Sequence, residues 1–318
     1  MTANAIDTHA HLWSDDYLSL LEDLGAKGVA IAKGLKASEQ EKDMQGRLAM
    51  MDKAQVSYQV LSATPQVPQF GNADQALGAA RLINNLYQEV IDKYPSHFKA
   101  YGAVPLPHVE AAILEGKRIM QELGFLGIAV NTVLENGQSL ADPAFVPFFE
   151  AMDALGAIIY VHPTGCGAFS PMVTDYEQEW TVGAPIEDLL ATVQLLKVDY
   201  PKRFPNLKFH MAHLGGGVSF QMQRLLDNYE DWHSFSHNPL TTLKKHFWFD
   251  TANFLEASLL HSQAILGQDR LLAGSDFPYF QDNKYSRAFS YIRQAPLDDR
   301  DTLAILKDNA EHLYADRW

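Results

Sequence analysis

Two histidines stand two residues apart near the start of the 318-residue chain. His9 and His11 belong to the segment 6–11, whose residue types favour a β-strand. Alternate side chains of a strand point to the same side, so both imidazoles can reach one metal ion. Neutral imidazole is the commonest nitrogen ligand of zinc and similar divalent ions. A half-exposed strand end would show the same spacing, and a metal site therefore needs partners elsewhere in the chain.

Three further polar side chains each follow a short apolar run, where a strand would pass into a loop. His162 stands before a proline, and a histidine there is about as often a hydrogen-bonding residue as a metal ligand. His213 precedes three glycines, which either let the backbone approach a bound molecule or form a tight turn. Asp276 lies in a Gly-Ser-Asp-Phe-Pro sequence, where turn formation requires no carboxylate, although an Asx turn would use one.

The other histidines are assigned to structure. His210 lies two residues before His213 and competes with it for the same role, but a deeper position on the strand favours packing. The remaining seven of the 12 histidines are interpreted as surface or packing residues: His97, His108, His233, His237, His246, His261 and His312.

Apolar runs and amphipathic stretches alternate along the chain. After the first strand, strands are expected at 56–62, 99–104, 125–130, 157–161, 207–212, 247–250 and 270–273. Helices are expected at 46–52, 73–94, 109–123, 144–155, 186–200, 218–229, 257–266 and 299–314. Eight strand-then-helix units predict an α/β fold, a (β/α)₈ TIM barrel, rather than an open doubly wound sheet.

The barrel gives the candidate residues a common position. On this count the five candidates fall at the carboxyl ends of strands one, five, six and eight, the face of such barrels that carries active sites. We expect one domain over residues 1–318, because α/β barrels reach this length as a single unit. The mixed segment 12–53 is expected to be an insertion packed over the barrel mouth, where loops usually carry specificity.

Composition and charge limit the class of protein. The chain is 47% hydrophobic and 20% charged, with a formal net charge of −14, which repels nucleic-acid phosphates and anionic membranes. No run approaches the roughly 20 apolar residues of a membrane span, and the first strand begins too early for a signal segment. A single cysteine, Cys166, excludes an internal disulfide framework. We therefore expect a cytoplasmic protein.

The donor types indicate one metal ion. Barrel hydrolases with two ions normally use a carboxylated lysine at the end of strand four, where this chain has Val130, Asn131 and Thr132. Three imidazoles and one carboxylate form a borderline-soft site, which suits Zn²⁺ first and Mn²⁺ second.

Short motifs occur in a fixed order through nearly the whole chain. The main ones are Asp7-x-His9-x-His11, Val161-His162-Pro163, Ala212-His213-x-Gly-Gly-Gly, Gly274-Ser275-Asp276-Phe277-Pro278 and Asn309-Ala310-x-x-Leu313. Supporting ones are Leu61-Ser62-x-x-Pro65, Asn84-Asn85, Leu123-Gly124-Phe125-x-Gly127 and Trp180-x-x-Gly183-x-Pro185-x-Glu187. Together they resemble the amidohydrolase superfamily, and within it the branch containing aminocarboxymuconate semialdehyde decarboxylase and the hydroxybenzoate decarboxylases.

The resemblance implies roles for single residues. It implies one metal ion held by His9, His11, His162 and Asp276, with His213 as the catalytic acid/base. The chemistry of a carboxylate would also let Asp276 help His213 as a proton relay. Arg47 matches an arginine that pairs with a substrate carboxylate in the semialdehyde decarboxylase. The resemblance also implies a homodimer or higher oligomer.

One departure from the family pattern concerns the substrate. An arginine that the family donates across its dimer interface is unmatched here, and the nearby position is Trp232. The muconate semialdehyde is therefore in doubt as substrate, and a monoacid or an aromatic acid is an alternative. Arg224 matches another family arginine, or is an exposed salt-bridge partner on its helix.

Three functions are compatible with these residues. The first is a metal-dependent decarboxylase of an unsaturated or aromatic carboxylic acid, with aromatic residues such as Trp180 lining a flat substrate pocket or packing loops over the mouth. The second is a hydrolase in which a metal-bound hydroxide attacks a lactone, amide or other acyl carbon. The third is a non-catalytic scaffold, in which retention of all five site residues would have no purpose.

Overall fold

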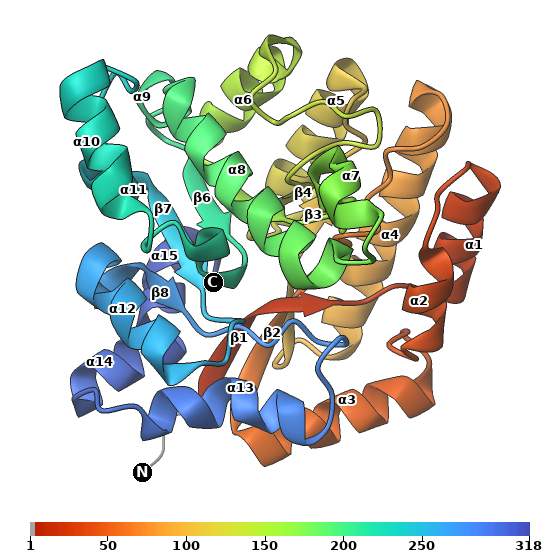
Figure 1. The fold of residues 1–318 in the computed structure, drawn as a ribbon. Coiled ribbons are helices and arrows are strands. Elements are labelled where there is room, and N and C mark those ends of the chain that lie inside the picture. Colours follow the sequence, from red (N-terminus) through yellow and green to blue (C-terminus); the bar gives the residue numbers. More distant parts are fainter. Residues whose placement is uncertain (1–3) are drawn as a thin grey trace.

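Eight parallel strands surrounded by helices form the protein (Figure 1). This computed structural model describes residues 4–318. The strands are β1 (Ala5–His11), β2 (Val56–Ser62), β3 (Phe98–Ala103), β4 (Gly127–Asn131), β5 (Ile158–His162), β6 (Lys208–Met211), β7 (Phe247–Asp250) and β8 (Leu271–Leu272). Each pairs in parallel with the next one along the chain. The predicted (β/α)₈ barrel is confirmed.

The chain after β8 lies beside β1 and nearly closes the barrel. The Thr8 amide donates to the Ala273 carbonyl at 2.9 Å, and the Asp276 amide donates to the His9 carbonyl at 2.9 Å. The His11 amide donates to the Phe277 carbonyl at 2.7 Å. This closure joins the segment after β8 to β1 and sets Asp276 beside the paired histidines of β1.

Helices cover the outside of the barrel. They are α1 (Asp15–Asp23), α2 (Val29–Gly34), α3 (Glu41–Ala54), α4 (Ala73–Lys93), α5 (Val109–Arg118), α6 (Val146–Asp153), α7 (Pro171–Thr174), α8 (Ala184–Lys197), α9 (Tyr200–Arg203), α10 (Met222–Trp232), α11 (Pro239–His246), α12 (Glu256–Leu266), α13 (Asn283–Gln294), α14 (Asp299–Leu303) and α15 (Asn309–Tyr314). Within the described residues, no helix has both the length and the apolar character that crossing a bilayer requires.

Local sequence explains where these helices begin and which face they bury. In α4, Asn72 and Gln75 form a reciprocal capping box, and Ala76, Ala80 and Ile83 face the core at helical spacing. Two predicted helices are less regular than expected. The first becomes π-helical at Ile119–Leu123 after α5, and the last has a π-helical turn at Ala304–Asp308 between α14 and α15.

Outside the segment 12–53, two helices of eight or more residues were not predicted. α13 buries Tyr285, Ala288, Phe289 and Ile292 in a polar sequence, at the spacing of an amphipathic helix that the sequence does contain. α11 spans eight residues between an Asn238 cap and β7, and is too short to show a clear period.

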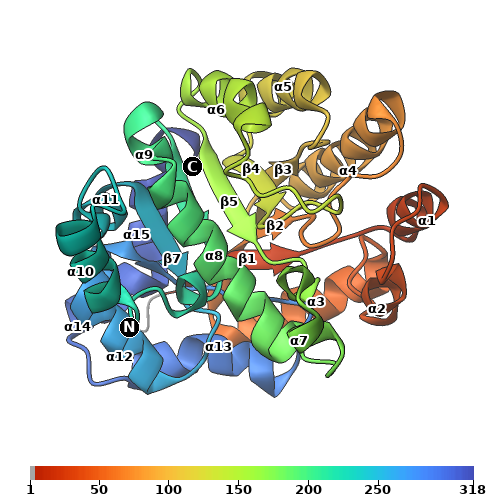
Figure 2. The ribbon, with the colours of Figure 1, turned by 45° about the horizontal axis from the view of Figure 1, so that its top comes forward.

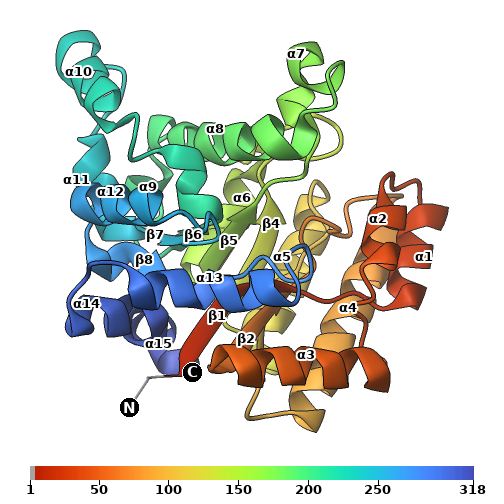
Figure 3. The same cartoon turned by 60° about the horizontal axis from the view of Figure 1, so that its bottom comes forward.

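The segment 12–53 contains three helices in two different places. α3 packs beside β2 and α13 in the position of the crossover helix between β1 and β2 (Figure 3). α1 and α2 pack on each other, and α1 also contacts α4, outside the ring of helices.

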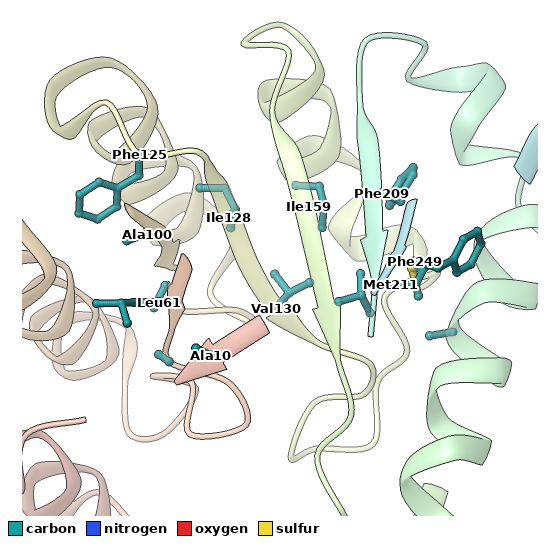
Figure 4. Close-up of a cluster of buried hydrophobic side chains, with 14 of the residues drawn as sticks. Ala10, Leu61, Ala100, Phe125, Ile128, Val130, Ile159, Phe209, Met211 and Phe249 are labelled. Atoms are coloured by element: carbon teal, nitrogen blue, oxygen red, sulfur yellow. The ribbon is translucent and has the colours of Figure 1, made fainter. Parts of the chain in front are cut away.

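Side chains of the strands alternate between two apolar layers. Leu61, Val130 and Ile159 point outwards and pack against the helices, in the layer partly shown in Figure 4. Their neighbours Val60, Ala129 and Tyr160 belong to a second cluster inside the barrel. Burying each large apolar side chain stabilises the fold by about 1.5–3 kcal/mol. The same alternation directs His162 inwards, two residues after Tyr160.

Candidate active site

Four predicted metal ligands meet inside the mouth of the barrel, where the ends of β1 and β5 approach each other (Figure 2). One ligand atom from each of His9, His11, His162 and Asp276 lies within 4.8 Å of all the others. Asp276 Oδ1 is 3.3 Å from His9 Nε2, 3.2 Å from His11 Nε2 and 3.9 Å from His162 Nε2. All four residues are buried.

The opposite nitrogen of each imidazole has its own partner. His9 Nδ1 lies 2.9 Å from Asp250 Oδ2, and His11 Nδ1 lies 2.9 Å from Ser62 Oγ. His162 Nδ1 donates to the Pro163 carbonyl at 2.7 Å. Such outer contacts fix the tautomer and the ring orientation of metal-binding histidines. The Nε2 atoms are thereby directed at the common centre.

The donor set fits a divalent cation. His162 Nε2 is buried and has no hydrogen-bond partner among the described residues, so a lone pair remains available in a dry interior. Three imidazoles facing one carboxylate suit Zn²⁺ or a similar ion. No lysine stands at the end of β4, because Asn131 occupies it and donates to the Pro65 carbonyl. These residues therefore match one metal ion.

Burial and neighbouring carboxylates set the charge of this cluster. Burial lowers the pKa of His11 to about 4, so its imidazole is neutral and able to bind metal at pH 7. Burial also lowers the pKa of His9, but the Asp250 and Asp276 carboxylates outweigh it and raise the pKa to about 9. The two carboxylates thus stabilise positive charge at this point.

His213 lies at the edge of the cluster. Its Nδ1 is 3.0 Å from Asp188 Oδ2, its Nε2 is 3.4 Å from Asp276 Oδ2, and its side chain is 18% exposed, against 2% or less for the three ligand histidines. Burial alone would lower the pKa of His213, but contacts with Asp188 and Asp276 raise it well above the usual value. The two carboxylates therefore favour the protonated form of His213, and one edge of its ring is accessible.

Gly216, in the glycine triplet after His213, is required by close packing. His213, Leu214, Gly215 and Gly216 are consecutively left-handed, with φ between 51° and 61°. A Cβ on Gly216 would lie 2.0 Å from the Pro185 carbonyl oxygen at the start of α8. The backbone strain is of the kind found at active sites, and the close approach is to α8, the helix that carries Asp188.

Two cavities open beside the cluster. One, of about 420 Å³, is lined by His162, His213 and Asp276 together with Asn253, Arg287 and the aromatic residues Trp180, Phe254, Tyr279 and Phe280. The other, of about 430 Å³, is lined by Lys27, Gly28 and Ile31 of the segment 12–53. Trp180 and Tyr279 line both cavities, and their ring centroids are 5.9 Å apart. Trp180 therefore forms part of the wall of both cavities.

Arg47 lies apart from both cavities and is 1% exposed. One terminal nitrogen donates to the His11 carbonyl at 2.8 Å, and the other donates to Gln59 Oε1 at 3.1 Å. The guanidinium lies 4.4 Å from the ring centroid of Phe277. Burial lowers the pKa of Arg47 to about 10, so it remains a cation at neutral pH. Its contacts hold the main chain of a metal ligand.

Sequence reasoning missed the two carboxylates that orient the histidines. Asp250 ends β7, at the same end of the barrel as the other site residues, and position alone could have identified it. Asp188 lies inside α8, where nothing local distinguishes it from an ordinary helical acid. His210, interpreted from the sequence as a packing residue, is buried, with its Nδ1 3.0 Å from the Tyr101 hydroxyl.

Known proteins resemble this chain over most of its length. The amidohydrolase family model (Amidohydro_2) matches residues 6–315. The 2-amino-3-carboxymuconate-6-semialdehyde decarboxylase of Dictyostelium discoideum is 30% identical over 73% of this chain and 66% of that protein, just under two thirds of its length. The gamma-resorcylate decarboxylase of a Polaromonas species is 25% identical over 84% of this chain and 86% of that protein.

Solved structures share the fold. The dihydroxybenzoic acid decarboxylase from a Polaromonas species, solved with bound manganese and an inhibitor, has a TM-score of 0.86 at 20% identity, over 99% of this chain and 97% of that one. The predicted resemblance is thus confirmed over nearly the whole length, and this chain belongs to the amidohydrolase family.

Proposed function

We propose that this protein is a metal-dependent carboxy-lyase that removes carbon dioxide from an unsaturated or aromatic carboxylic acid. The observation that carries the proposal is that one cavity, of about 420 Å³, is lined both by residues of the metal cluster and by aromatic side chains. The first set is His162, His213 and Asp276, and the second is Trp180, Phe254, Tyr279 and Phe280. Flat aromatic surfaces suit a planar conjugated substrate. The decarboxylase relatives support this reaction.

His9, His11, His162 and Asp276 would hold one ion. When bound, a divalent metal ion supplies Lewis acidity, which stabilises negative charge on a substrate oxygen. Three imidazole ligands favour Zn²⁺, whereas the manganese in the Polaromonas structure favours Mn²⁺. Metal analysis of protein purified without chelator decides between them.

In this proposal His213 donates a proton to the substrate carbon. When the bond to the carboxylate breaks, its electron pair stays on the substrate carbon, which must take up a proton as carbon dioxide leaves. His213 lines the cavity, and Asp188 holds its Nδ1 so that Nε2 can deliver that proton. Asp276 contacts His213 through Oδ2 and would also help to hold the metal, and so it links the two functions.

Arg47 and Trp180 have supporting roles in this proposal. Because Arg47 donates to the His11 carbonyl and to Gln59, we assign it an indirect effect on the substrate through the position of His11. Trp180 packs on the flat face of the substrate together with Tyr279.

A single assay tests the reaction class. Hydroxybenzoates, unsaturated dicarboxylates and lactones are supplied with Zn²⁺ or Mn²⁺ in ¹⁸O-labelled water, and carbon dioxide and labelled products are measured together. We expect carbon dioxide release and no incorporation of the label into the remaining organic product. Labelled product without carbon dioxide would replace the lyase with the hydrolase alternative.

We also propose a cytoplasmic homodimer. The lone Cys166 suits a reducing compartment, since it has no second cysteine with which to form an internal disulfide. Light scattering measures the oligomeric state, and a monomer at micromolar concentration would overturn the dimer.

A further inference from the structure

Among the described residues that line the 420 Å³ cavity, Arg287 is the one arginine or lysine. It belongs to the second turn of α13 and shares this cavity with His213 and Asp276. Within residues 4–318, no hydrogen bond or ion pair connects its guanidinium to another residue. An exposed cation without a partner is therefore available to a bound molecule.

Most other arginines already have partners. Arg118 and Arg81 pair with Glu115, and Arg203 pairs with Glu150. Arg293 and Arg317 donate to main-chain carbonyls. Within the described part of the chain, the side chains of Arg224 and Arg300 also lack a hydrogen-bond or ion-pair partner, but both are exposed and line neither cavity at the mouth. Arg287 thus combines a free guanidinium with a place in the site.

The aromatic residues beside Arg287 hold it in place. Its guanidinium carbon lies 5.4 Å from the centroid of the Phe254 ring. Phe254 in turn packs edge-to-face on Phe280 at 4.9 Å, and its backbone is left-handed at φ 66°. Stacking on a fixed ring leaves the edge of a guanidinium, with its parallel N–H donors, free to meet a carboxylate at two points.

We propose that Arg287 binds a second carboxylate of the substrate, so that the preferred substrates are unsaturated or aromatic dicarboxylic acids. The inference rests on the proposed decarboxylase function. One carboxylate lies at the His162 and Asp276 end of the cavity, and the other pairs with Arg287. Because the chain carries a net charge of −14, a dianion is repelled at long range and needs a local cation to bind.

A matched pair of ligands tests the subsite. We compare 2-hydroxybenzoate with 5-carboxy-2-hydroxybenzoate, which differs by one carboxylate. Turnover is followed by carbon dioxide release, and binding by quenching of tryptophan fluorescence, since Trp180 lines the cavity. Wild-type protein is expected to bind the diacid more tightly than the monoacid. In Arg287→Gln the KM and the Kd for the diacid rise by about 10- to 100-fold, the cost of a lost charged contact.

Further readouts separate this role from a general loss of structure. In Arg287→Gln, kcat for the diacid is expected to stay within about twofold of wild type, as are KM and Kd for the monoacid. Arg287→Lys recovers part of the diacid affinity, because a charge remains but the two-point geometry is lost. Arg300→Gln, an exposed arginine outside the cavity, leaves all values unchanged.

The outcomes distinguish the subsite from the reaction. Equal weakening of both ligands in Arg287→Gln, unchanged diacid binding, or no preference for the diacid in wild type would each overturn the subsite. If wild type binds the diacid through Arg287 but releases no carbon dioxide from any acid, the subsite stands and the decarboxylase proposal fails.

Discussion

Two buried carboxylates at the barrel mouth have different surroundings. Asp276 is 8% exposed and faces the imidazoles of His9, His11 and His213, with His162 slightly farther away. Glu187 is 2% exposed and accepts from Thr132 Oγ1 at 2.9 Å, from the Thr164 amide at 2.6 Å and from Thr164 Oγ1 at 3.0 Å. We call the second set, Glu187 with Thr132 and Thr164, the Glu187 network.

The difference lies in how fully the polar atoms are used. The hydroxyl and amide donors of the Glu187 network each find an acceptor, and the network ties the loop after β5 to α8. Around Asp276, His162 Nε2 keeps an unused lone pair. A satisfied buried network is scaffold, whereas a buried cluster with lone pairs to spare is built for a ligand.

The largest effect is expected from removal of the metal. Chelation should reduce turnover by roughly 1000-fold or more, since several kcal/mol of charge stabilisation are lost. It should also lower the Tm, because a bound ion stabilises the folded state. Carbon dioxide release and differential scanning calorimetry measure the two effects, and Zn²⁺ or Mn²⁺ should restore both. Protein that is active yet free of divalent metal would contradict the assignment of the cluster.

The next effect separates proton transfer from metal binding. His213→Ala should lower kcat by about 100- to 10,000-fold, the usual contribution of a positioned acid or base. Metal content should remain at one ion per chain, because His213 is not among the four grouped ligands. His162→Ala is the matched variant, in which metal content falls together with activity. Loss of metal from His213→Ala would show that the two roles are not separate.

A third, intermediate effect concerns the carboxylate behind His9. Asp250 Oδ2 lies 2.9 Å from His9 Nδ1, and Asp250 Oδ1 accepts from the His213 amide at 3.1 Å. Asp250→Asn should weaken metal binding by about 10- to 100-fold, as the loss of such outer partners does. Competition with a chromogenic chelator measures the affinity. An unchanged affinity would mean that His9 is held in place without Asp250.

The sequence predicts which residues come together where a metal-binding residue type stands directly after an apolar run. The ligand histidines and Asp276 each follow an apolar run, and the barrel order places the ends of those runs at one face. Asp250 carries the same signal at the end of β7, although it is not among the five candidates. Asp188 carried none, because only the packing of α8 brings it 3.0 Å from His213.

The direction in which Arg47 and Arg287 point could not be predicted from the sequence. Arg47 and Arg287 both lie on helices that pack beside each other, α3 and α13. Arg47 turns inwards to Gln59 and the His11 carbonyl, whereas Arg287 lines the cavity. Which way a long side chain points depends on the neighbouring helices and loops, so no pattern within either helix could distinguish them.

The smallest effect on activity is expected from Glu187→Gln, which breaks the Glu187 network and leaves the metal cluster intact. An amide in place of one carboxylate oxygen turns an acceptor into a donor facing Thr132, Thr164 and their neighbours. The unfolding free energy should fall by about 1–3 kcal/mol, the penalty for buried polar groups without partners. Denaturant unfolding measures that loss, and metal affinity should stay within about twofold of wild type.

The reverse pattern is expected for His162→Ala, in which metal affinity falls more than the unfolding free energy does. The reason is that Nε2 of His162 has no hydrogen-bond partner within the described residues, so its removal breaks no such bond. If Glu187→Gln lost metal as readily as His162→Ala, the presence or absence of hydrogen-bond partners would not distinguish a structural network from a metal site.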